Sequence, residues 1–128
     1  MSAAQESVSV KQVDLWIGGA NIAPSSAKYF DSLNPLDDSV YARAALGTAE
    51  DMDRAVNAAH TAFGGYRLSV AKDREAWLSK AASLLEEQAD QFVDILIDEI
   101  GSSLSKARFE IGAAVAILRA ASGSTRMV

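Results

Sequence analysis

The feature that most constrains this chain is the stretch FEIGAAVAIL at residues 109–118, in which Glu110 is the only polar side chain. A serine pair precedes this region, so we predict a helix from about Leu104 to Ser122 or slightly beyond, capped by Ser102 or Ser103. Because apolar residues cover essentially every face of such a helix, it has to be buried on all sides. The other predicted elements are too few to surround it, so we expect something outside the 128 residues to cover one side.

Two further helices are predicted before this one. Thr48 and Asp51 form a start that resembles a capping box, and apolar residues recur with helical spacing from Met52 to Phe63. This first helix covers about residues 49–63 and should end at Gly64-Gly65. Ser69 can cap a second, long helix of about 45 Å, in which apolar residues keep the helical period until Gly101 ends it.

The segment before the helices has the pattern of a small sheet. Residues 1–12 are small and polar, and we expect them to form a disordered tail. The β-favouring run Leu15-Trp16-Ile17 is followed by Gly18-Gly19, which predicts a turn into a second short strand. A longer strand over residues 28–33 ends before Pro35, and a last short strand covers residues 40–44.

The predicted fold class is therefore an α+β fragment with a small amino-terminal β-hairpin and sheet followed by three α-helices. Its organisation is a disordered tail at residues 1–12, a β-hairpin and short strands at 13–45, and a three-helix segment at 46–128.

Charge and composition restrict the partners and the chemistry. The chain has 12 basic and 17 acidic residues and a net charge of −5, and its basic residues are scattered, so nucleic acid and anionic membranes are not expected as partners. No apolar run approaches the roughly 20 residues of a membrane span and the start lacks the pattern of a signal peptide, so we predict a cytoplasmic protein. The chain has no cysteine, which excludes a disulfide framework and a cysteine nucleophile within it.

The remaining candidates for chemistry have simpler explanations. His60 shares a helical face with Asp53 and Asn57, which indicates a solvated surface histidine rather than part of a Ser-His-Asp site. A run of carboxylates on the second predicted helix favours a solvated face over a metal or acid/base site. The glycine pairs fit neither GxGxxG nor a P-loop. The carboxylates are Glu86, Glu87, Asp90, Asp94, Asp98 and Glu99.

The order and spacing of five segments resemble the amino-terminal part of the NAD(P)-dependent aldehyde dehydrogenase superfamily, from Leu15 to the last residue. The stretch GSSLSKARFEIGAAVAILRAA, which begins at Gly101, is similar to the branch that oxidises aromatic aldehydes such as vanillin, benzaldehyde and salicylaldehyde. The five segments are LWIGG at 15–19, YFDSLNP at 29–35, LGTAEDMDRAVNAAHTAF at 46–63, REAWLSKAASLLEEQADQFVDILIDEIG at 74–101 and LRAASGSTRMV at 118–128.

The resemblance implies that these residues precede the family's coenzyme-binding units, nucleophilic cysteine and general-base glutamate. The parent enzyme would use NAD or NADP to oxidise an aldehyde to its carboxylic acid. The 128 residues alone would bind neither dinucleotide and would not oxidise the aldehyde. The resemblance implies that this chain contains no catalytic and no cofactor-binding residue. It places Glu99, with backbone near Ser32 and Leu33, at a monovalent-cation site, with helix-end structure as the alternative. It places Phe109 and Ala113 beside the substrate tunnel, with core packing as the alternative.

A second hypothesis from another class stays open at this point. The chain could be a free-standing, non-catalytic helical interaction module that kept a fold and lost its chemistry. The expected partner is the remainder of the aldehyde dehydrogenase fold or a second copy of the chain, by self-association through the third predicted helix. Both hypotheses explain a helix with an uncovered side.

Overall fold

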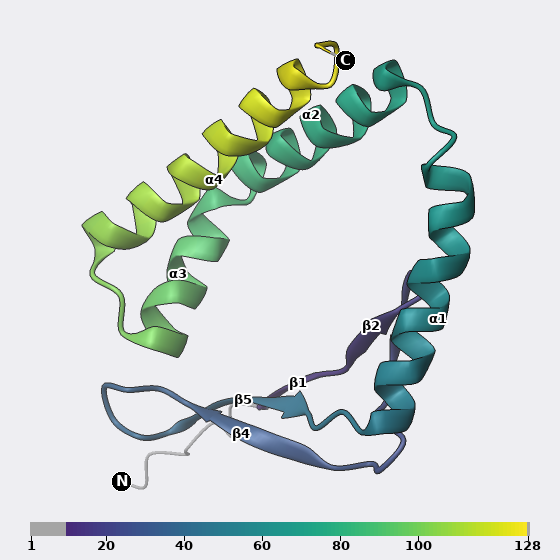
Figure 1. Cartoon of the computed structure of the whole chain (residues 1–128). Coiled ribbons are helices and arrows are strands. Elements are labelled where there is room, and N and C mark those ends of the chain that lie inside the picture. Colours follow the sequence, from purple (N-terminus) through teal and green to yellow (C-terminus); the bar gives the residue numbers. More distant parts are fainter. Residues whose placement is uncertain (1–9, 128) are drawn as a thin grey trace, which may run out of the picture. The chain divides into compact units, whose positions relative to one another are not determined.

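The chain divides into two compact units, residues 1–58 and residues 59–128. A computed structural model describes residues 10–127, and these form five short strands followed by four helices (Figure 1). The α+β class expected from the sequence is confirmed, with the strands in the first unit and most of the helical residues in the second.

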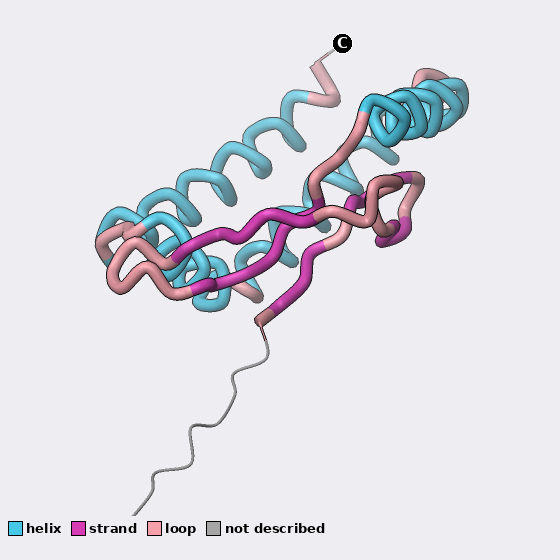
Figure 2. Tube along the Cα trace, turned by 90° about the horizontal axis from the view of Figure 1, so that it is seen from below, coloured by secondary structure: helices cyan, strands magenta, loops and turns pink. Residues whose placement is uncertain are grey.

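The first unit contains two small sheets. Strands β1 (Lys11–Val13), β5 (Val40–Ala45) and β4 (Tyr29–Leu33) form a sheet in the order β1-β5-β4, and β2 (Leu15–Ile17) pairs with β3 (Ala20–Ile22) as a hairpin (Figure 2). Strand β1 runs parallel to β5, whereas β4 runs antiparallel to it.

The β2–β3 hairpin turns as the glycine pair predicts. Gly18 and Gly19 have φ values of 63° and 85°, which side chains with a Cβ rarely adopt and which match the twist of a two-residue hairpin loop. Strand β1 begins at Lys11, inside the segment expected to be a tail, because its backbone pairs with residues 42–44 of β5. Of the rest of that expected tail, residues 1–9 lie outside the described residues.

The helices are α1 (Ala49–Tyr66), α2 (Ala71–Glu87), α3 (Ala89–Ile100) and α4 (Leu104–Ser124). The prediction of one long second helix is wrong, because the chain breaks at Gln88, whose φ of −107° and ψ of 15° leave the helical range. The break gives α3 its own direction, and both α2 and α3 pack against α4 (Figure 1). The expected three helices are thus four in the described residues.

The predicted boundaries at Gly101 and Ser103 hold, whereas the helix end at Gly64-Gly65 and the Ser69 cap are wrong. The N-cap of α2 is Val70, and no side chain caps this helix. Gly101 ends α3 in the left-handed conformation, with φ 65°, and the side chain of Ser103 caps α4 by accepting a hydrogen bond from the Lys106 amide. Helix α1 continues through Gly64 and Gly65, because glycine lowers helix stability without preventing the helical conformation. Its predicted end at residue 63 was therefore about one turn too early.

Small residues bring α2 and α4 together. Ala82 on α2 and Ala107 on α4 are 0% exposed, which indicates close approach of the two helices. At the other end of this contact the Ser122 hydroxyl donates to the Glu75 carbonyl at 3.1 Å and shares a 2.7 Å hydrogen bond with the Ser79 hydroxyl. This pairing fixes which face of α4 points inward.

None of the helices in the described part of the chain is both long enough and apolar enough to cross a membrane.

Candidate functional site

The two residues predicted to line a substrate tunnel lie on the outer face of α4. Phe109 is 74% exposed and Ala113, one turn later, is half-buried. Ile117 continues this row by another turn and is 68% exposed. Residues four apart on a helix share a face, so Phe109, Ala113 and Ile117 form one apolar row, which we call the α4 outer row.

The opposite face of α4 is occupied by α2 and α3. Val115 is buried on α4 and Val93 is buried on α3, and together with Ala107 they make the core of the second unit. Arg126 forms two hydrogen bonds to the Glu75 carboxylate, at 2.6 and 2.7 Å, beyond the end of α4. Helix α4 is therefore held from one side, and its outer row points away from the unit that holds it.

A groove of about 640 Å³ runs beside the α4 outer row, and the sequence analysis did not predict it. Its apolar floor includes Val93, Ile111 and Val115, and the small side of the groove is formed by Gly112 and Ala116. Charged residues stand at its rim, where Arg119 pairs with Glu86 while Asp90 and Arg108 also line the edge. The sequence signal for it was a glycine and several alanines in the middle of a long helix.

Glu99 lies in the last turn of α3, two residues before the left-handed Gly101, and its side chain is exposed. Residues Ser32 and Leu33, which the family resemblance associates with it, belong to the other compact unit. Within residues 10–127 no group of three or more histidine, cysteine, aspartate or glutamate side chains is arranged to hold a metal ion. The cation role of Glu99 stays a prediction.

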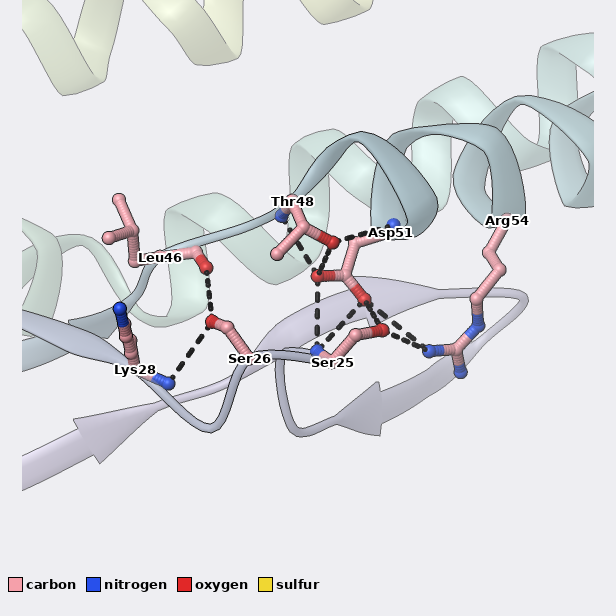
Figure 3. Close-up of polar contacts among 7 residues, drawn as sticks. All are labelled: Ser25, Ser26, Lys28, Leu46, Thr48, Asp51 and Arg54. Carbon is pink, nitrogen blue, oxygen red and sulfur yellow. Dashed lines mark hydrogen bonds and ion pairs between the residues drawn. The ribbon is translucent and has the colours of Figure 1, made fainter.

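The strongest polar cluster surrounds Asp51 in the first turn of α1, which is only 3% exposed (Figure 3). Its carboxylate accepts hydrogen bonds from the amide and the hydroxyl of Ser25 and from the amide and the hydroxyl of Thr48, at 2.7–3.1 Å. Arg54 adds an ion pair at 3.4 Å. The Thr48–Asp51 capping box is thus confirmed, and Ser25 is a partner that sequence reasoning missed.

The electrostatics of this cluster follow from its donors. The Ser25 hydroxyl, followed by the Thr48 amide, holds the pKa of the Asp51 carboxyl well below its usual range. A carboxylate so fully occupied by donors is a poor proton acceptor and has little capacity left for a ligand. The cluster, which we call the Asp51 clasp, therefore joins the loop at residues 24–27 to the start of α1 and is not a reactive site.

His60 is exposed on α1, as the sequence predicted. With no cysteine in the sequence, no thiolate can attack a carbonyl carbon within these residues. What the structure presents instead is exposed apolar surface on the α4 outer row and a groove beside it.

Residues 22–128 match the aldehyde dehydrogenase family. The chain belongs to this family. It is 39% identical over 95 residues to the vanillin dehydrogenase of Corynebacterium glutamicum, covering 74% of this chain and 20% of that protein. Relative to the vanillin dehydrogenase of a Pseudomonas species it is 33% identical over 116 residues, covering 91% of this chain and 24% of the relative. The chain thus spans between a fifth and a quarter of these aldehyde dehydrogenases.

Solved aldehyde dehydrogenase structures contain the same fold. The NAD-dependent benzaldehyde dehydrogenase from Corynebacterium glutamicum superposes with a TM-score of 0.85 and 33% sequence identity, covering 92% of this chain and 26% of the enzyme. The salicylaldehyde dehydrogenase from Pseudomonas putida G7, solved with salicylaldehyde, gives a TM-score of 0.86 at 26% identity, covering 89% of this chain and 24% of the enzyme. The arrangement of strands and helices described above is therefore an aldehyde dehydrogenase arrangement.

Proposed function

We propose that this chain is the amino-terminal portion of an NAD(P)-dependent aldehyde dehydrogenase that oxidises an aromatic aldehyde to its carboxylic acid in the cytoplasm. The observation that carries the proposal is the family match over residues 22–128, together with relatives that are named for vanillin and benzaldehyde. In such an enzyme the dinucleotide accepts the hydride. The chain contains no glycine-rich fingerprint that would hold a dinucleotide and no thiol, so we assign it neither role.

The part of this chain in the proposed function is to shape the approach of the substrate. Phe109 offers an aromatic ring and Ala113 leaves width beside it, on a helix face that the second unit does not cover. A planar aldehyde fits between a ring and a small residue better than beside two bulky ones. Glu99 would contribute to a monovalent-cation site, and the expected partner of the α4 outer row is the remainder of the dehydrogenase fold.

A chimeric enzyme tests this proposal directly. Residues 22–128 would replace the corresponding segment of the Corynebacterium benzaldehyde dehydrogenase, whose backbone superposes on this chain with a TM-score of 0.85. We expect the chimera to fold and to reduce NAD with benzaldehyde, while the 128-residue chain alone reduces none because it has no thiolate. A well-folded chimera without activity, or steady cofactor reduction by the isolated chain, would contradict the proposal.

Within that chimera, Ala113→Trp separates a tunnel residue from a core residue. If Ala113 gives width to the substrate path, kcat/KM for benzaldehyde should fall by roughly 10- to 200-fold, the scale of a clash worth about 1–3 kcal/mol, while a two-carbon aldehyde is spared. Ala76→Trp, on the exposed side of α2, is the matched control. Equal losses for both substrates with a lowered melting temperature would identify Ala113 as a packing residue.

A non-catalytic interaction module is the second candidate, and the exposed α4 outer row is the observation that favours it. Under this candidate the partner of the row would be a second copy of the chain. The mass of the natural polypeptide distinguishes the two, because an enzyme of this family needs the coenzyme-binding units and a module does not.

A further inference from the structure

We draw no further inference here: the strongest candidate, the apolar groove between α3 and α4 that Asp90 and Arg108 border, carries none because nothing in the structure shows what covers it.

Discussion

The Asp51 clasp and the α4 outer row solve the same problem in opposite ways. At the clasp, a buried carboxylate receives all its donors from Ser25, Thr48 and Arg54 of the same unit. At the outer row, Phe109 and Ile117 stay mostly exposed although they sit on a helix whose inner face is well packed. The first region satisfies its polar groups by itself, and the second leaves large apolar side chains exposed.

The difference shows why a segment of a large fold can have all its buried polar groups paired and still expose large apolar side chains. Buried polar groups find their hydrogen-bond partners within the same unit, because a buried donor or acceptor without a partner lowers the stability of the fold. Apolar side chains can stay exposed in a folded segment, because each one loses only part of the free energy that its burial would contribute. Variants of the clasp should therefore change the stability of the chain, and variants of the outer row should change its association.

Removing the Asp51 carboxylate should give the largest loss of stability. Asp51→Ala leaves the amides and hydroxyls of Ser25 and Thr48 without their acceptor, so the loop at residues 24–27 and the first turn of α1 should exchange amide hydrogens much faster. Glu50→Ala, an exposed acid in the same turn, is the control and should change little. Equal protection in both variants would mean that the clasp does not hold the loop.

Overfilling the contact between α2 and α4 should give the next largest effect. Ala107→Leu inserts three carbons at a fully buried position and should lower the free energy of unfolding by about 1–3 kcal/mol, seen as a lower midpoint in urea. Ala76→Leu, at an exposed position of α2, should leave the midpoint nearly unchanged. A tolerated Ala107→Leu would show that the two helices are not closely packed.

Acid should weaken the first unit through the clasp. The folded pKa of Asp51 lies below that of an unfolded aspartate, about 3.9, so its contribution is fully present above that value and disappears as the pH falls through the folded pKa. Melting temperatures measured from pH 6 downwards should therefore fall below about pH 5. The fall should be shallower in Asp51→Asn. It should not vanish, because Ser39 lowers the pKa of Asp37 in the same direction.

The smallest expected change in folding stability belongs to the outer row. Phe109→Ser removes a ring that is 74% exposed, so the free energy of unfolding of the monomer should change by no more than about 0.5 kcal/mol. Binding of a dye for apolar surfaces, or association of the chain, should decrease clearly in the same variant. A large loss of monomer stability would show that Phe109 belongs to the core after all.

Sequence reasoning predicted those features that depend on neighbouring residues. The Thr48–Asp51 capping box, the left-handed Gly101 and the turn at Gly18-Gly19 each follow from local backbone chemistry. The break at Gln88 carries no proline or glycine, and we attribute it to the packing of α2 and α3 against one helix. Ser25 is 26 residues from Asp51, and no local pattern relates the two.

For the candidate site, too, sequence reasoning predicted what depends on local spacing and missed what depends on packing between helices. The helical spacing of Phe109 and Ala113 was enough to put them on one face, and the structure shows that α2 and α3 leave that face uncovered. The groove beside them could not be predicted, because it is lined partly by α3, whose direction depends on the unpredicted break at Gln88. Glu99 and the tunnel assignment rest on resemblance, so they remain predictions.

The pairing of β1 with β5 has a consequence for how the amino terminus can be handled. Lys11 pairs with Ala42, 31 positions later, so the first strand to be synthesised can join the sheet only after β5 exists. Removing residues 11–13 would turn β5 from the central strand into an edge with unpaired amides and carbonyls. A tag or deletion that reaches Lys11 should therefore promote strand-to-strand aggregation, whereas one that stops before residue 10 leaves β1 paired with β5.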